Sequence, residues 1–63
     1  FDMFSLKEKQ IIAFASQGYT NKDIGDKLSI AEGTVKNYLY RIYKKLNIHN
    51  KKDLKAYSLK YFD

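Results

Sequence analysis

The chain has 63 residues, a formal net charge of +5 and no cysteine, which allows one small domain and excludes disulfides and thiolate metal sites. Such a domain buries only about 60% of the surface of its unfolded chain, so its core must be thin. No run of about 18 apolar residues is present, so no segment is expected to cross a membrane.

The positive charge lies mainly in the second half of the chain. Residues 1–33 carry four lysines against five acids, whereas residues 34–63 carry seven lysines and one arginine against two acids. A basic half beside a near-neutral half is typical of a protein that binds a polyanion. A lysine-rich surface that serves only solubility would give the same composition.

An all-α fold is predicted, because the chain has no proline, no two-residue alternation of apolar side chains and no Gly/Ser-rich linker. Start and stop residues place four helices, at about 5–17, 20–28, 32–46 and 50–61. Residues 1–63 therefore form a single domain in this interpretation.

The first two helices have clear start signals. Ser5 forms a capping box with Glu8, and Gly18 supplies a left-handed stop after the first helix. Thr20 repeats the capping pattern with Asp23 at the start of the second helix.

The start of the second helix is also a candidate phosphate site. Free N–H groups and the positive end of the helix dipole attract anions there, and Lys22 adds a charge. Thr20, Asn21 and Lys22 are therefore predicted to contact a DNA phosphate, although capping alone would also explain Thr20.

The link to the third helix is short, with Ile30 as its apolar plug. Gly25 lies inside the second helix, where glycine costs about 1 kcal/mol relative to alanine, and its small size would let the second and third helices approach closely. A short capped helix, a tight link and a longer helix are the layout of a helix-turn-helix.

The third helix has one apolar face and one polar face on a wheel of 100° per residue. Lysine can donate to guanine or phosphate, asparagine can pair with adenine, and tyrosine can contact phosphate or a thymine methyl group. The polar face thus suits the major groove, although an ordinary solvated face is the alternative. The apolar face holds Val35, Leu39, Ile42 and Leu46, and the polar face holds Gly33, Lys36, Asn37, Tyr40 and Lys44, with Arg41 at its flank.

The fourth helix begins at Asn50 and has two stripes. Leu54, Ser58 and Phe62 suit the core, and the second stripe consists of Tyr57 and Tyr61. Tyrosines are enriched in interfaces, but tyrosines that only lie along the surface are an equal alternative.

His49 is the only histidine and is expected to be an exposed loop residue near phosphate. With no second histidine and no cysteine, neither a metal site nor a catalytic base is predicted, and no cofactor is expected. The chain is therefore not expected to be an enzyme.

Four stretches, in order, carry a family resemblance: FSLKEKQII from Phe4, GYTNKDIG from Gly18, LSIAEGTVK from Leu28 and IYKKLNIHNK from Ile42. They resemble the LuxR/FixJ-type (GerE-like) helix-turn-helix of bacterial transcription regulators, over nearly the whole chain. The most specific part is the ordered set NKDI, TVK and KL. The resemblance implies a four-helix domain, related to winged helices but without a wing, at the C-terminal end of a longer cytoplasmic regulator.

The resemblance implies sequence-specific binding to double-stranded DNA, as a homodimer on inverted half-sites, with RNA polymerase as a further candidate partner. The last helix is the implied dimer contact, through Tyr57 and Tyr61. The implied base-reading residues are Lys36, Asn37 and Tyr40, and the predicted phosphate contacts are Thr20, Asn21, Lys22, Thr34, Arg41 and Lys44.

The chain departs from the family pattern at a few positions. Ala31 replaces the serine or threonine that caps the third helix, a loss of about 1 kcal/mol. Lys51 replaces an arginine that the resemblance places beside Glu8, so this ion pair is expected to be weaker. Tyr38 replaces a histidine, and Gly25 replaces an alanine.

Two alternative functions stay open at this point. A sigma-factor-like reader of promoter DNA shares this helix-turn-helix, but would not dimerise and would depend on RNA polymerase. A helical protein-interaction module with a basic surface would lack the strong salt dependence that DNA binding requires.

Overall fold

In the computed structural model, the backbone of residues 3–61 and the side chains of residues 3–60 are described, and they form four helices. The helices are α1 (Leu6–Ser16), α2 (Asn21–Leu28), α3 (Glu32–Leu46) and α4 (Lys51–Tyr61). The all-α prediction is confirmed, and each predicted boundary lies within one residue of the observed one. No strand occurs in the part of the chain that the structure describes.

The predicted caps explain where the helices begin. Ser5 and Glu8 form the full capping box, with the Glu8 N–H donating to Ser5 Oγ at 3.2 Å and the Ser5 N–H donating to Glu8 Oε1 at 2.8 Å. Thr20 Oγ1 accepts from the Asp23 N–H at 3.1 Å, but the reciprocal bond of the predicted capping box is not formed. Asn50 Oδ1 caps α4 with a 2.8 Å hydrogen bond. These side chains satisfy N–H groups that a helix start leaves without backbone partners.

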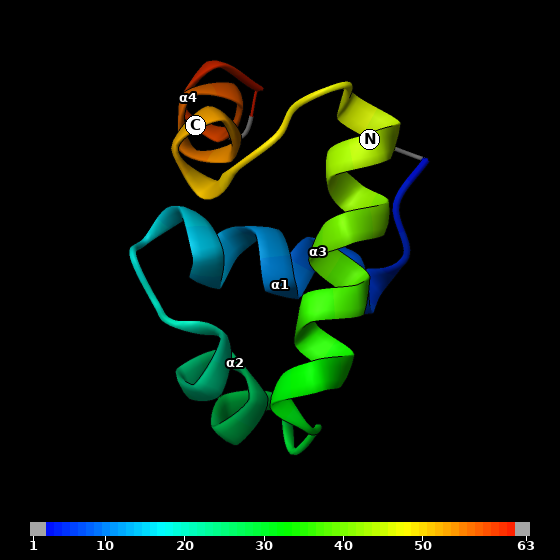
Figure 1. Cartoon of the computed structure of the whole chain (residues 1–63). Coiled ribbons are helices and arrows are strands. Elements are labelled where there is room, and N and C mark those ends of the chain that lie inside the picture. Colours follow the sequence, from blue (N-terminus) through cyan, green and yellow to red (C-terminus); the bar gives the residue numbers. More distant parts are fainter. Residues whose placement is uncertain (1–2, 62–63) are drawn as a thin grey trace.

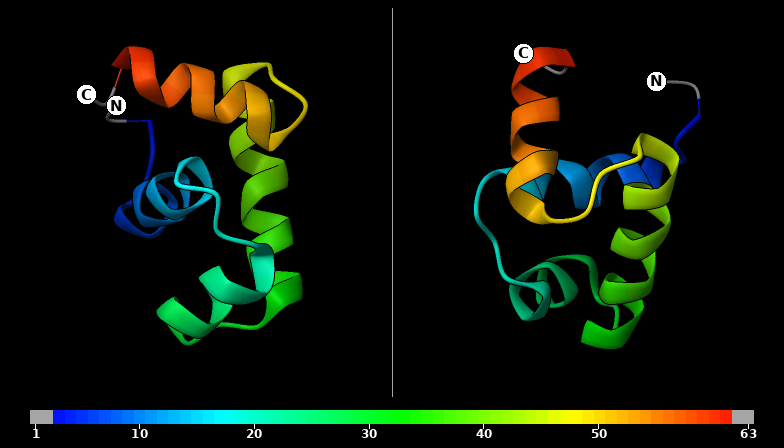
Figure 2. Two further views of the ribbon diagram at one scale, coloured as in Figure 1. Left: turned by 90° about the vertical axis from the view of Figure 1, so that its left-hand side faces the viewer. Right: turned by 45° about the horizontal axis from the view of Figure 1, so that its top comes forward.

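The other three helices are arranged around α3 (Figures 1 and 2). In both figures α2 and α4 lie at opposite ends of α3, and α1 lies between them. The most extensive helix contacts are those of α1 with α4 and of α2 with α3. Because its neighbours lie on one side, α3 keeps a long face toward solvent.

Residues from all four helices meet in one small core. The predicted apolar face of α3 is confirmed, since Val35, Leu39 and Ile42 are buried and Leu46 packs half-buried against them. Phe62, predicted for the core, lies outside the described residues. The other buried apolar side chains are Phe4, Ile11, Ile12, Ala15, Ile24 and Leu54.

A left-handed residue ends each of α2 and α3. Ser29 (φ 58°) is the C-terminal cap of α2, and Asn47 (φ 56°) is the C-terminal cap of α3. Ile30, the predicted plug, is half-buried against the core, and its N–H donates to the Gly25 carbonyl at 2.9 Å. The tight turn before α3 is therefore defined by backbone geometry as well as by packing.

The prediction that Gly25 permits a close approach is confirmed. A Cβ atom at this position would lie 2.6 Å from the Ile30 carbonyl oxygen and 3.5 Å from the Glu32 amide nitrogen. Even alanine, with its better helix propensity, would require the backbone of the turn to move. Gly25 thus sets how closely the turn packs on α2.

The expected pairing of Lys51 with Glu8 is wrong. The Glu8 carboxylate lies instead at the last turn of α3, where Lys45 Nζ donates to its two oxygens at 3.1 and 3.0 Å. Lys51 lies at the start of α4 and donates to the Tyr19 carbonyl at 3.4 Å. Packing of α1 against the end of α3, which no local pattern encodes, selects Lys45 as the partner.

Lys45 also holds the segment before α1. Its Nζ donates to the Met3 carbonyl at 3.0 Å and lies 5.3 Å from the centre of the Phe4 ring. The hydrogen bond from the Ser5 N–H holds the pKa of the Glu8 carboxyl below its usual value, and Lys45 lowers this pKa to a smaller extent. Burial acts in the opposite direction. One lysine thus joins the N-terminal segment, α1 and α3.

Candidate nucleic-acid interface

The solvent-facing side of α3 carries most of the residues predicted to contact DNA. Their side chains belong to one continuous helix of 15 residues, so their relative spacing is fixed by the helix geometry. None of them belongs to the buried core. The exposed predicted residues of α3 are Thr34, Lys36, Asn37, Tyr40, Arg41 and Lys44.

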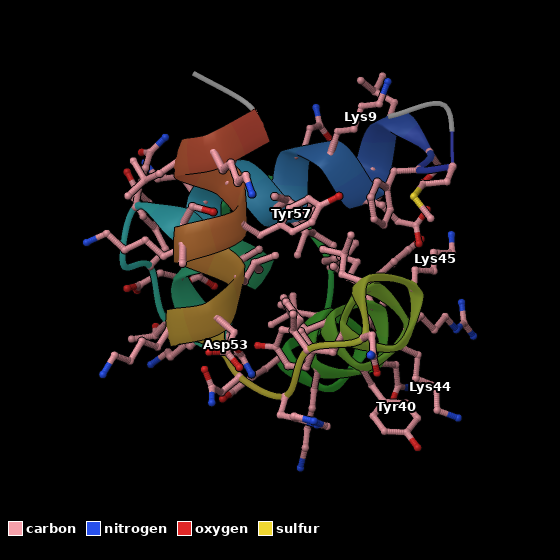
Figure 3. All side chains as sticks on the ribbon, turned by 90° about the horizontal axis from the view of Figure 1, so that it is seen from above. Lys9, Tyr40, Lys44, Lys45, Asp53 and Tyr57 are labelled. Atoms are coloured by element: carbon pink, nitrogen blue, oxygen red, sulfur yellow. The ribbon has the colours of Figure 1, made fainter. Side chains whose placement is uncertain are left out.

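Tyr40 and Lys44 form a pair on this face. The Tyr40 side chain is 61% exposed, and Lys44 Nζ lies 4.8 Å from the centre of its ring. Figure 3 shows both side chains on the outer side of α3, pointing away from α1 and α4. A cation over the ring face restrains both side chains, so the phenol and the ammonium group are presented together.

The start of α3 has N–H groups without a side-chain cap. Ala31 makes no capping hydrogen bond, as its identity predicts, and its carbonyl accepts from the Thr34 and Val35 N–H groups. The first N–H groups of a helix have no partner within the helix. At Gly33 a Cβ atom would meet nothing within 4 Å, so this end of α3 is open to a close ligand.

The start of α2 provides the other predicted phosphate contacts. Thr20 is exposed and its hydroxyl is used for capping, while the Lys22 side chain is exposed. Asn21 is half-buried, and its Oδ1 is buried without a hydrogen-bond partner among the described residues. A phosphate contact by Asn21 would therefore use its backbone N–H or its Nδ2 group.

Two adjoining hollows, of about 410 and 360 Å³, lie beside this face of α3. Tyr40, Tyr43 and His49 line both of them. The larger hollow also includes Asn21 together with Lys36 and Asn37, and thus joins the start of α2 to the polar face of α3. Neither hollow is lined by a carboxylate, so both suit an anionic ligand.

The sequence did not assign Tyr43 to this surface, and it gave His49 only as an exposed loop residue near phosphate. Tyr43 is half-buried, and burial raises the pKa of its phenol above the usual value, so the ring stays a neutral hydrogen-bond donor near neutral pH. His49 is exposed in the turn between α3 and α4. A wheel of α3 alone could not place a turn residue beside the start of α2.

The predicted dimer residues on α4 are only partly described. Tyr57 is half-buried, and Figure 3 shows its ring turned toward α1, so it is less accessible than expected. The side chain of Tyr61 lies outside the described residues. The large apolar side chain that α4 does expose is Leu59, at 58%, which the stripe pattern missed.

The described residues contain neither a metal-binding cluster nor a membrane-spanning helix. No group of three or more His, Cys, Asp or Glu side chains among them could hold a metal ion. Within the same part of the chain, no helix has the length and hydropathy needed to span a bilayer.

Comparison with known proteins gives a consistent result. The family model described as "Bacterial regulatory proteins, luxR family" matches residues 2–58. The chain is 39% identical over 62 residues to the transcriptional regulatory protein LnrK of Bacillus subtilis, covering 95% of the chain and 28% of that protein. It is 37% identical over 60 residues to the oxygen regulatory protein NreC of Staphylococcus carnosus, with the same two coverages.

A third relative is the DNA-binding transcriptional activator DevR/DosR of Mycobacterium tuberculosis. The identity is 40% over 45 residues, which cover 71% of the chain and 21% of that protein. The chain thus spans less than a third of the length of these relatives.

Proposed function

Because the chain belongs to the luxR family of bacterial regulatory proteins, as a DNA-binding domain and not an enzyme, we propose that its α3 reads base edges in the major groove. The residues that do so are Lys36, Asn37 and Tyr40. The observation that supports this most directly is their shared exposure on a face of α3 that is free of carboxylates past its first turn.

The chemistry of the three side chains suits different base edges. Lys36 can donate to guanine O6 and N7, and Asn37 can pair with adenine N6 and N7. Tyr40 can lay its ring against a thymine methyl group while Lys44, held above that ring at 4.8 Å, reaches the neighbouring phosphate. A mixed half-site, with guanine and adenine close together, is the expected target.

Phosphate contacts on both sides of the groove would fix the position of α3. Thr20, Asn21 and Lys22 lie at one edge, at the start of α2. On the helix wheel, Thr34 and Arg41 lie at the opposite edge of the polar face of α3. Contacts of this kind orient a protein on the duplex without reading its sequence.

Lys22→Ala is expected to weaken binding to every duplex by a similar factor. The exposed ammonium group of Lys22 lies in the first turn of α2, where it would neutralise one phosphate. Loss of one such contact lowers the slope of log K against log salt concentration by about one unit per protomer. The measurement is a salt titration of binding by fluorescence anisotropy.

Lys27→Ala is the matched control for this experiment. Lys27 has the same charge and exposure but lies in the last turn of α2, away from the proposed contact. If the two variants change the salt slope equally, the start of α2 makes no specific phosphate contact.

We further propose that two copies occupy an inverted pair of half-sites through α4. The exposed Leu59, together with the predicted contact residues Tyr57 and Tyr61, would make this contact from a single helix. The area that one helix can bury is well below the roughly 1,200 Å² typical of stable complexes, so the free domain would be monomeric and DNA would hold the two copies together.

Replacing Leu59 by Ser is expected to reduce cooperative binding to a full site and to leave the affinity for a half-site unchanged. The double change of Tyr57 and Tyr61 to Ser should have the same effect. Because Tyr57 packs toward α1, the thermal stability of the double variant must first be compared with that of the wild type. Gel-shift titrations of half and full sites separate the two affinities. Equal losses on both would assign these residues to folding and remove α4 from the dimer contact.

The domain would act as the output part of a longer cytoplasmic regulator, as the limited coverage of its relatives suggests. Within such a regulator, RNA polymerase is the candidate partner for activation. Co-purification of the longer protein with polymerase on operator DNA would test that step.

A further inference from the structure

The turn between α3 and α4 lies against the start of α2. Asn21 and His49 line the same hollow, although Asn21 begins α2 and His49 follows the end of α3. Lys51, two residues after His49, donates to the Tyr19 carbonyl at 3.4 Å, directly before the Thr20 cap. The turn and the start of α2 therefore form one continuous edge of the α3 face.

This edge is rich in groups that favour an anion. His49 is exposed, and both hollows that it lines are free of carboxylates. Two acids lie in neighbouring first turns, Asp23 in α2 and Asp53 in α4, but neither lines a hollow. The titratable groups that share the hollows with His49 are Lys36, Tyr40, Tyr43 and Lys44.

We propose that His49 is an additional DNA-backbone contact, and that its protonation makes the affinity of this domain for DNA depend on pH. The imidazolium form would contact a phosphate of the same strand that meets the start of α2. Tyr43, which lines both hollows and stays neutral, would donate a hydrogen bond beside it. This proposal rests on the proposed insertion of α3 into the major groove.

The size of the effect follows from counterion release. Each phosphate that a protein neutralises adds about 0.9 to the slope of log K against log salt concentration. Histidine changes charge between about pH 5 and pH 8, so the slope should be steeper by up to that amount at the acidic end of this range. DNA affinity at low salt should rise in parallel.

The test compares the wild-type domain with His49→Gln on two duplexes of equal length. One duplex is an operator selected in vitro from a randomised pool, and the other is an unrelated sequence. Salt titrations are carried out at about pH 6 and about pH 8, within the range in which histidine changes charge. Glutamine keeps a hydrogen-bond donor but carries no charge, and thermal unfolding at both pH values verifies that the variant folds.

The wild type is expected to show a steeper salt slope at the lower pH on both duplexes. His49→Gln should show equal slopes at both pH values and match the wild type at the higher pH. Since His49 is the only histidine, a pH dependence that persists in the variant would overturn the proposal, as would a pH-independent wild type.

Lys52→Gln serves as the matched control, because Lys52 is exposed, lies near His49 in sequence and lines neither hollow. It should keep the pH dependence of the wild type. The same data test the proposed reading of bases by α3 separately. If that proposal is wrong, the selected and unrelated duplexes bind equally well. The difference in salt slope between the wild type and His49→Gln would still report the backbone contact.

Discussion

Lys36→Ala is expected to weaken binding to a specific operator by about 1–3 kcal/mol, while binding to unrelated duplexes falls much less. Lys36 lies on the exposed face of α3, one helical turn before Tyr40, and lines the hollow that Asn21 also lines. A lysine in this position can donate to guanine O6 and N7, which together distinguish guanine from the other bases in the major groove. Its loss therefore removes discrimination as well as charge.

The experiment compares dissociation constants for the operator and for an unrelated duplex at one salt concentration. Lys55→Ala, an exposed lysine of α4, provides the control for the loss of one positive charge at a distance from α3. A base substitution in the operator at the position read by Lys36 should no longer matter to the Lys36→Ala variant. Equal losses on both duplexes would make Lys36 a phosphate contact only.

Lys45→Ala is expected to destabilise the domain considerably more than Glu8→Gln. The side chains of the two partners are exposed to different extents, 37% for Lys45 and 8% for Glu8. Removal of Lys45 leaves a buried carboxylate without its charged partner, which costs about 3–5 kcal/mol in fully buried pairs. Because Lys45 is more than a third exposed and the 2.8 Å hydrogen bond from the Ser5 N–H remains, the cost should fall below that range.

Glu8→Gln leaves the partly exposed Lys45, which can turn to solvent, so this variant should lose less stability. Since small domains are stabilised by only about 5–15 kcal/mol in total, the difference is large enough to be seen by urea denaturation. Equal destabilisation by the two variants would show that the carboxylate is not effectively buried.

The same pair predicts the response to acid. The pKa of Glu8 is lowered in the folded state from a usual value of 4.5. Its contribution to stability is therefore complete above the unfolded-state pKa and is lost as the pH falls through the lower folded-state value. In Lys45→Ala that folded-state pKa should rise, so acid unfolding should begin at a higher pH, whereas Glu8→Gln should lose this component of the pH dependence.

Much of the fold follows from local signals in the sequence. Ser5, Thr20 and Asn50 are residue types that favour helix starts, and the structure uses all three as caps. The apolar face of α3 was equally clear, because its period is that of a helix. Helix positions and the polar face of α3 were therefore predictable without knowledge of packing.

The features that could not be predicted depend on contacts between distant segments. Lys45 lies in the last turn of α3 and Lys51 at the start of α4, and only the packing of α1 decides that Lys45 reaches Glu8. The position of His49 beside Asn21 depends in the same way on the path of the turn. The exposure of Leu59 on α4 was not predicted, because no local sequence pattern marks an exposed leucine.

The left-handed residue that ends α3 has a consequence for how much sequence one copy can distinguish. Asn47 stops the helix at 15 residues, roughly 22 Å at 1.5 Å per residue, and a straight rod of that length follows the curved floor of a groove only near its leading end. If α3 enters the major groove as proposed, about three or four side chains would reach base edges. One domain would then specify only a short DNA sequence, and recognition of a unique genomic site would require the second copy proposed above.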